Sequence, residues 1–273
     1  MKRVKKIRIR IWLLIVAIAL IAAGFISPLK LTEYDLTFDY LPEEFDGYKI
    51  VQISDFHCKD FGENEEDLIE LVKEAEPDLI VMTGDIVDED HDTENALLLL
   101  EGFEDIAPVY YVTGNHEYYT GAPFDEFLSI CRDTGTHVLM NSSADISKGD
   151  SKIILTGMDF TTNPANYISE IGYGDASYFN ILLYHDSSKF NFLSSFDYDL
   201  IFAGHIHGGL VRLPFLGGVF GSDYRFFPEY DCGVFYKKTS CMVSSAGLGD
   251  ARIPRWNNPR EVVLVTLHSS QSN

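Results

Sequence analysis

The sequence of 273 residues is poor in positive charge, and it contains no low-complexity tract and no repeat of fixed period. Lys and Arg number 21 against 42 Asp and Glu, which gives a formal net charge of −21 at pH 7. Such a chain repels nucleic acids and other polyanions unless cations are present at the point of contact. We therefore expect no nucleic-acid partner, and an anionic substrate would need positive charge supplied from outside the sequence.

Cysteine is also scarce, since the chain has 4 and none of them forms a CxxC pair. This spacing argues against a thiolate metal site. Cys232 and Cys241 flank a predicted hairpin that turns near Lys237 and Lys238, and a disulfide between them would be permitted outside the cytoplasm. The alternative is that all four are small, buried apolar residues. The other two are Cys58 and Cys131.

Positive charge is concentrated at the N-terminus, where residues 1–10 (MKRVKKIRIR) contain Lys and Arg but no acid. An uncharged apolar run follows at 11–29, and as a helix it would be about 28 Å long, close to the thickness of a bilayer core. Basic residues before such a run favour a cytoplasmic N-terminus. The pattern predicts a transmembrane signal anchor with the rest of the chain outside the cytoplasm. The alternative is a signal peptide cleaved near residues 22–24, which would give a secreted protein.

The rest of the chain divides into a link at 30–48, one domain at 49–268 and a tail at 269–273, because no linker rich in Pro, Gly or Ser interrupts the body. Apolar runs alternate with helical patterns, which predicts an α/β domain. In such sheets, functional loops gather at the carboxyl ends of the strands. The predicted strands are 49–53, 79–82, 109–112, 137–140, 152–155, 179–184 and 200–202, with more strands in 230–267; the predicted helices are 65–75, 95–103 and 124–132.

Polar side chains of the same few types follow five of these strands. In chain order they are Asp55 and His57, Asp85, Asn115 and His116, His185, and His205 and His207. Carboxylate, amide and imidazole groups together suit manganese, iron or zinc, and neighbouring glycines allow close backbone approach. A single Asp-x-His or Gly-Asp pair is typical of a surface turn. Five such groups in order, each directly after an apolar run, predict a metal site.

This ordered set resembles the calcineurin-like metallophosphoesterase superfamily, whose pattern is DxH, GDxxD, GNH[DE], a lone His and GHxH. All five blocks are present between Asp55 and His207. The later stretches GGLVRLPF, FFPEYDCGVFY, SSAGLG and IPRWNNPREVVLVTL look like the membrane-associated bacterial phosphodiesterase branch, which includes enzymes similar to UDP-2,3-diacylglucosamine hydrolases. The resemblance covers about residues 45–267 and implies a four-layer αββα fold, in which helices flank two mixed sheets.

The resemblance also implies roles for individual residues in a site for two divalent ions, with manganese favoured and iron, zinc or cobalt as alternatives. His116 would face the scissile phosphate as a proton donor or a charge stabiliser, and Asp88, the second acid of GDIVD, would orient His116. Two adjacent ions can share a hydroxide and neutralise a phosphate, which would supply the positive charge that the chain lacks. The implied ligands are Asp55, His57 and His207 for the first ion, Asn115, His185 and His205 for the second, and Asp85 for both.

The implied activity is that of a metal-dependent phosphodiesterase or pyrophosphatase on a lipid-linked or envelope substrate similar to a UDP-diacylglucosamine. An apolar groove for such a substrate is predicted in 210–216 and 224–227, although core packing explains these segments as well. The alternatives are an enzyme for a soluble nucleotide-type phosphodiester and a surface protein that binds metal without catalysis.

Three charged positions bear on the class of substrate. Protein phosphatases of the superfamily have Arg-Gly after the second acid of GDxxD, whereas Glu89 follows it here, which disfavours that class. Arg212 and Arg252 are either substrate contacts or solvated surface residues.

Overall fold

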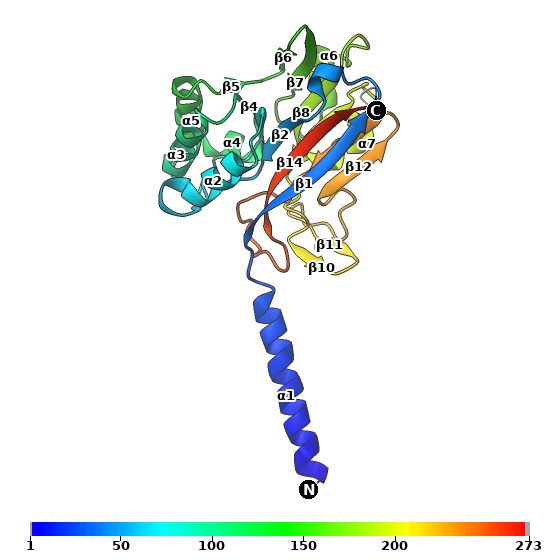
Figure 1. Cartoon of the computed structure of the whole chain (residues 1–273). Helices are drawn as coiled ribbons and strands as arrows, with labels where there is room; N and C mark the ends of the chain where they lie inside the picture. The colour runs from blue at the N-terminus through cyan, green and yellow to red at the C-terminus, as the bar shows by residue number, and fades with distance from the viewer. Residues whose placement is uncertain (1, 271–273) are drawn as a thin grey trace.

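The computed structural model describes residues 2–270. Its domain contains two six-stranded mixed sheets, with helices on their outer faces (Figure 1). The strand orders are β1-β14-β2-β3-β4-β5 and β12-β13-β9-β8-β7-β6. The predicted α/β fold with two mixed sheets is therefore confirmed.

In the first sheet, β2 to β5 run parallel to one another and β14 runs antiparallel to β2. The carboxyl ends of the parallel strands consequently meet at one edge of the sheet. The strands are β1 (Leu29–Phe38), β2 (Tyr48–Ile53), β3 (Leu79–Thr83), β4 (Val109–Val112), β5 (His137–Val138) and β14 (Arg260–Ser269). The helices between them are α2 (Glu66–Glu74), α3 (Glu94–Phe103), α4 (Asn115–Thr120) and α5 (Ala122–Asp133), with the short 3-10 turns η1 (Glu43–Phe45) and η2 (Glu63–Glu65).

The second sheet has a parallel centre, β7-β8-β9-β13, and antiparallel edges. Its strands are β6 (Ser142–Lys148), β7 (Ser151–Gly157), β8 (Asn180–Asp186), β9 (Leu200–Gly204), β12 (Gly233–Lys237) and β13 (Ser240–Ser244). Helices α6 (Ala165–Ile171) and α7 (Phe190–Leu193), the turn η3 (Ser187–Lys189) and a separate hairpin of β10 (Val211–Leu213) and β11 (Gly217–Phe220) complete the domain.

Buried side chains form three apolar layers that hold the elements together. Neighbouring residues of one strand point into different layers, since Ile50 packs between the two sheets and Val51 packs under α2, α3 and α5. In the second sheet Leu183 likewise packs between the sheets, whereas Leu182 packs against α7. Strands that are covered on both faces read as continuous apolar runs, which is why the sequence revealed them.

Residues 30–48 do not form the predicted link. Most of them belong to β1 and η1, and β1 pairs in parallel with β14 from Leu29 to Phe38. The domain therefore begins with β1 and not at residue 49. Of the predicted tail, residues 271–273 lie outside the described residues.

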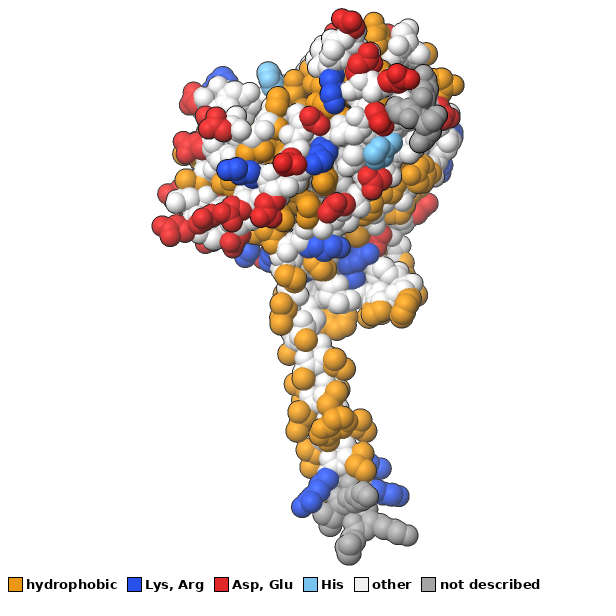
Figure 2. Space-filling view, viewed as in Figure 1, with side chains coloured by type: hydrophobic (Ala, Val, Ile, Leu, Met, Phe, Trp, Pro, Cys, Tyr) orange, Lys and Arg blue, Asp and Glu red, His pale blue; other side chains and the backbone are white. Residues whose placement is uncertain are grey.

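The N-terminal helix α1 (Lys2–Ala23) projects from the domain (Figure 1). Its large apolar side chains are exposed, and Lys and Arg side chains lie near its far end (Figure 2). Within residues 2–270, no helix is both long enough and apolar enough to cross a membrane. The predicted membrane-spanning helix at 11–29 is not confirmed, because α1 includes the basic residues at its start and ends at Ala23.

All four cysteines are free, so the bridge between Cys232 and Cys241 is not formed. Three of them are buried, which agrees with the alternative of small core residues, and Cys232 is half-buried. The hairpin that these two cysteines flank is formed, since β12 pairs with β13 around a turn next to Lys237.

Candidate metal centre

The loops after β2, β3, β4 and β9, together with the last residues of β8, bring the predicted ligands together at the carboxyl ends of these strands. Within the described residues, three groups have nitrogen and carboxylate oxygen atoms that all lie within 4.8 Å of one another. Asp85 and His57 each belong to two of these groups, so the groups form one continuous cluster. The groups are Asp55, His57 and His207; His57, Asp85 and His116; and Asp85, His185 and His205.

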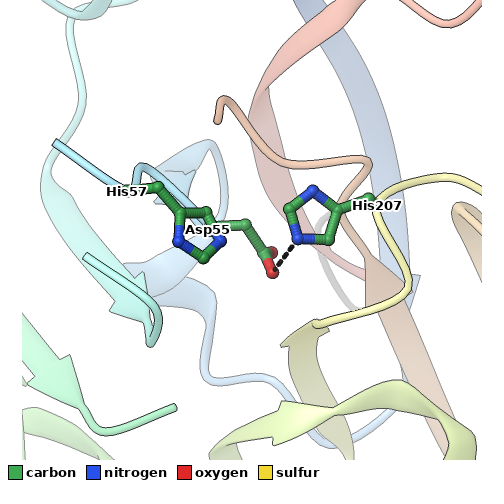
Figure 3. A group of neighbouring side chains, drawn as sticks. All are labelled: Asp55, His57 and His207. Atoms are coloured by element: carbon green, nitrogen blue, oxygen red, sulfur yellow. Dashed lines mark ion pairs between the residues drawn. The ribbon is translucent and has the colours of Figure 1, made fainter. Parts of the chain in front are cut away.

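In the first group the carboxylate of Asp55 lies between the rings of His57 and His207 (Figure 3). Nε2 of His207 is 3.3 Å from Oδ1 of Asp55, and the two imidazole rings are stacked with centroids 5.3 Å apart. Asp55 also accepts hydrogen bonds from the hydroxyl of Ser54, at 2.6 Å, and from the amide of His205, at 3.1 Å. These bonds fix the carboxylate in the orientation that a ligand requires.

In the third group, Asp85 and His205 both approach Nε2 of His185. Oδ2 of Asp85 lies 3.1 Å away and Nδ1 of His205 lies 3.2 Å away. Nδ1 of His185 donates to the carbonyl of Thr83 at 2.7 Å, which directs the Nε2 lone pair of a neutral ring into the cluster. A backbone carbonyl on the far nitrogen is the usual arrangement around a histidine that binds metal.

Two predicted ligand atoms are buried without a hydrogen-bond partner, Nε2 of His57 and Oδ1 of Asn115. A buried polar atom without a partner costs about 1–3 kcal/mol, so such atoms call for an explanation. Both lie in the cleft that the cluster lines. The imidazole, carboxylate and amide donors match the preferences of manganese, iron, cobalt and zinc. The residues therefore fit divalent metal ions.

The backbone at the cluster is strained. Five of the seven predicted ligands have φ in the left-handed region, which side chains other than glycine rarely adopt. Each such residue costs of order 1–3 kcal/mol and persists only where its surroundings hold it in place. Strain concentrated at the ligands indicates that these loops are shaped for the site. The angles are 50° at Asp55, 51° at His57, 52° at Asp85, 76° at His205 and 49° at His207.

Two glycines allow the loops to approach this closely, as predicted. A Cβ atom at Gly114 would lie 2.2 Å from Oδ1 of Asp85, and one at Gly204 would lie 2.4 Å from Oδ2 of Asp55. Real Cβ atoms do not come this near. Any side chain at either position would therefore displace the carboxylate of Asp85 or of Asp55.

Asp85 and His185 form a buried ion pair in the protein alone. Burial by itself would raise the pKa of Asp85, but His185 outweighs it and the pKa is lowered. Burial by itself would lower the pKa of His185, but Asp85 outweighs it and raises the pKa to about 10. Without metal, His185 therefore carries a proton beside the carboxylate of Asp85. A metal ion bound at the same place would release that proton.

His116 is not oriented by Asp88, and this corrects the role implied by the resemblance. Nδ1 of His116 lies 2.7 Å from Oε2 of Glu89, the next residue along the chain. Asp88 instead contacts Nδ1 of His57 at 3.3 Å and Nδ1 of His91 at 2.8 Å. Although burial would raise the pKa of Asp88, these two histidines lower it to about 2. Asp88 therefore supports a predicted metal ligand, and Glu89 contacts the predicted proton donor.

Two residues next to the cluster have roles that the sequence did not reveal. Glu117 is buried and accepts hydrogen bonds from the amides of Gly114, at 2.6 Å, and Asp85, at 2.9 Å, which ties the loops after β3 and β4 together. In the sequence, Glu117 is marked by its position as the acid of the GNHE block. Arg255 is also buried, with Nη2 3.3 Å from Nδ1 of His207. Nothing distinguished this arginine in the sequence.

Part of the cluster forms the floor of a cleft of about 410 Å³, whereas Asp55 and His185 are fully buried and do not line it. Arg252 lines the cleft, whereas Arg212 is paired with Asp231 at 2.8 Å and does not. The side chains around the opening differ from the buried ligands, since most are exposed. The lining residues outside the predicted ligands are Asp88, Glu89, Asp90, His91, His116, Tyr119, Ser222, Tyr224, Asp250, Ala251 and Arg252.

A two-sheet fold with a cleft of histidines, carboxylates and an amide at its strand ends defines a metallophosphoesterase, a hydrolase of phosphoester bonds that depends on divalent metal ions. The family profile described as "Calcineurin-like phosphoesterase" matches residues 48–209. The chain belongs to that family.

Curated relatives carry the same description in general terms. The uncharacterized metallophosphoesterase YkuE of Bacillus subtilis is 30% identical over 259 residues, which cover 91% of this chain and 89% of that protein. The uncharacterized metallophosphoesterase Cj0846 of Campylobacter jejuni is 30% identical over 93% of this chain and 68% of that protein. A "Transmembrane protein with metallophosphoesterase domain" of Danio rerio is 28% identical over 54% of this chain and 35% of that protein.

Proposed function

We propose that the protein hydrolyses phosphodiester or diphosphate bonds at a centre of two divalent ions. The observation that carries this proposal is the shared position of Asp85 between two groups of ligands on the floor of one cleft, with His116 at the side of the same cleft. One ion would be held by Asp55, His57 and His207, and the other by Asn115, His185 and His205. Asp85 would contact both.

When bound, the ions would supply Lewis-acid activation of water and positive charge against the phosphate. The protein residues supply the rest of the chemistry. His116 is only half-buried and its ring lies edge-on to that of His57, at 4.7 Å. A proton on its ring is therefore available to the oxygen of the leaving group. General acids of this kind typically accelerate a reaction by about 10²–10⁴-fold.

The charges around the cleft support a diester in preference to a phosphomonoester. Glu89 occupies the position where the phosphatases of the superfamily have an arginine, and Asp90 follows it. Carboxylates at the opening disfavour the doubly charged monoester more than the singly charged diester.

A lipid-linked substrate, such as a compound similar to UDP-diacylglucosamine, is supported by exposed aromatic side chains beside the cleft. Tyr224 lines the cleft, and Phe226 and Phe227 follow it in the chain and are exposed. Large exposed apolar surfaces often mark binding sites for apolar partners. A soluble nucleotide-type phosphodiester remains the alternative substrate, and it would need no such surface.

For the location, the proposal is that the exposed apolar surface of α1 attaches the protein to the cell membrane, with the catalytic domain on the outer side. Support comes from the basic residues that precede the apolar run and from the relative that is named a transmembrane protein. Fractionation of cells, with protease treatment of spheroplasts, tests this point. Recovery of the full-length chain in the soluble cytoplasmic fraction would contradict it, and a shortened chain in the medium would indicate cleavage and secretion.

The activity is tested with the full-length protein in detergent, loaded in turn with Mn²⁺, Fe²⁺, Zn²⁺ or Co²⁺. We expect turnover of bis-p-nitrophenyl phosphate and at least about tenfold lower kcat/KM for p-nitrophenyl phosphate. The variant His116→Ala should keep its metal and lose about 10²–10⁴-fold in kcat with diphenyl phosphate, whose leaving group needs a proton more than p-nitrophenolate does. Absence of turnover in protein with verified metal content would favour a non-catalytic metal-binding protein. Loss of metal from His116→Ala would make His116 a ligand.

The substrate class is tested by comparing a UDP-linked diacylglucosamine in mixed micelles with a soluble nucleotide phosphodiester. A higher kcat/KM for the lipid in micelles is expected. A preference for the soluble diester would overturn the assignment to a lipid while leaving the diesterase activity intact.

A further inference from the structure

The loop after β3 contains two neighbouring carboxylates that contact different histidines. Glu89 contacts Nδ1 of His116 at 2.7 Å, and Asp88 contacts Nδ1 of His57 at 3.3 Å. The two carboxylates also differ in burial, since Asp88 is buried and Glu89 is exposed. We infer that Glu89 is the residue that positions His116 for proton donation, while Asp88 serves the metal ligand His57. This inference rests on the proposed function and assigns Glu89 a role in it.

Asp88 has no free oxygen for His116. Its Oδ1 accepts from the amides of Asp90 and His91, both at 3.0 Å, and contacts Nδ1 of His91 at 2.8 Å. Its Oδ2 faces His57. These bonds turn the carboxylate toward the base of its own loop and leave the next residue to reach His116.

The ring of His116 is held on several sides, and Glu89 supplies the polar contact. The backbone amide of His116 donates to Oδ1 of Asp85 at 2.8 Å. The ring packs edge-on against His57 and against Tyr119, at centroid distances of 4.7 and 5.9 Å. With its Nδ1–H donated to Glu89, the ring has one nitrogen left for the substrate, Nε2.

The resulting step is a simple proton transfer. The oxygen of a water molecule bonds to phosphorus, and that water releases one proton to solvent. As the bond between phosphorus and the leaving oxygen breaks, its electron pair goes to that oxygen and the proton on Nε2 of His116 follows. The imidazole then regains a proton from solvent. The carboxylate of Glu89 stabilises the positive charge of the ring before the transfer and fixes which nitrogen carries the mobile proton.

The kinetic test uses two diesters with different leaving groups and full-length protein of equal metal content. Phenolate is a poorer leaving group than p-nitrophenolate and depends more on receiving a proton. The loss of kcat in a variant with an impaired proton donor should therefore be larger with the phenyl diester. For Glu89→Ala we expect kcat to fall about 10–100-fold with diphenyl phosphate and less than about threefold with bis-p-nitrophenyl phosphate, with KM for both within about twofold. Glu89→Gln keeps an acceptor oxygen without its charge and should lose less.

Two further variants make the kinetic result specific. Asp90→Asn removes a charge from the adjacent exposed residue and should show no dependence on the leaving group. In a His116→Ala background, Glu89→Ala should cause no additional loss, because the partner on which it acts is missing. Equal losses for both diesters, or losses that add in the double variant, would overturn the inference.

A spectroscopic test does not depend on turnover. In full-length zinc-loaded protein with ¹⁵N-labelled histidine, the Nδ1–H of His116 should give a downfield proton resonance. Its absence from the spectrum of His116→Ala assigns the resonance to His116. The resonance should disappear in Glu89→Ala and persist in Asp88→Asn. A resonance that persists in Glu89→Ala and disappears in Asp88→Asn would mean that Asp88 positions His116. Absence of diester turnover in the unaltered protein would refute the proposed function, and the resonance would still decide which carboxylate contacts His116.

Discussion

The floor and the rim of the cleft are built on different principles. What we call the floor is the set of seven predicted ligands at the ends of five strands. Five of them line the cleft, Asp55 and His185 are fully buried, and all except His205 are buried. The rim consists of Glu89, Asp90, His91, Tyr119, Tyr224 and Arg252, and its side chains are exposed. The floor is held by loops with strained backbone and by hydrogen bonds to the ligands. The rim residues come from the loops after β3, β11 and β13 and from helix α4.

The difference separates two kinds of variant. Changes in the floor should act on metal content first and on rate as a consequence. Changes in the rim should leave metal content unchanged and alter the choice of substrate or the step of bond cleavage. Asp88 lies on the boundary, because it lines the cleft and yet contacts a floor histidine.

The largest effects are expected for His205→Ala and His207→Ala. The two imidazoles belong to different ligand groups, so each variant should lose about half of the bound metal and retain the other ion. Activity should fall by more than about 100-fold, because even supporting residues around a metal cost 10–100-fold when changed. Elemental analysis and diester hydrolysis measure both quantities. A matched control is His268→Ala, a histidine of β14 that does not line the cleft and pairs with Asp35.

Equal loss of both ions from each of these variants would contradict the division of the floor into two sites. It would mean that the shared ligand Asp85 makes binding of the two ions strictly coupled.

A smaller effect is expected for Asp88→Asn. The amide no longer attracts the Nδ1–H of His57, which loosens the orientation of this ligand. The metal concentration for half-maximal rate should rise about 10–100-fold, while kcat at saturating metal stays within about threefold. Titration of the rate with Mn²⁺ measures this, with Glu89→Gln as the partner variant that should not shift the titration. A fall in kcat at saturating metal as large as that of His116→Ala would mean that Asp88 acts on the proton donor.

The floor could be predicted from the sequence because its signals are local. Each apolar run of β2, β3, β4, β8 and β9 ends directly at a polar residue, and helices α2, α3 and α5 have clear apolar faces. The pairing of β1 with β14 could not be predicted, since the two strands lie more than two hundred residues apart and β1 is an edge strand with exposed side chains.

The rim was harder to predict for a different reason. Asp88 and Glu89 are adjacent acids, and only the folded loop decides which of them meets His116. Arg255 likewise reaches His207 from a C-terminal loop without any pattern around it. Contacts of this kind depend on loop conformation, which apolar periodicity does not encode.

The smallest effect is expected for Glu65, a buried carboxylate outside the cleft that can be compared with the carboxylates of the floor. Floor carboxylates are buried beside imidazoles, whereas Glu65 is buried at the start of α2 with the amide of Phe61 as its hydrogen-bond donor, at 3.2 Å. Burial raises the pKa of Glu65 to about 7. A raised pKa means that the folded state favours the protonated acid, so this stability is fully present below the pKa of the unfolded chain, near 4.5, and is lost as the pH rises through 7. Glu65→Gln cannot ionise and should avoid that loss.

We therefore expect the melting temperature of Glu65→Gln, relative to the unaltered protein, to be higher at pH 8 than at pH 5. The gain should be about 1 kcal/mol, which corresponds to roughly 2–4 °C for a domain of this size. Thermal unfolding followed by circular dichroism at both pH values measures it, with Glu66→Gln as the control, because Glu66 is the exposed neighbour. The same difference at both pH values would mean that Glu65 is solvated when ionised. Glu65 would then offer no contrast with the floor carboxylates, which stay buried and are paired with imidazoles.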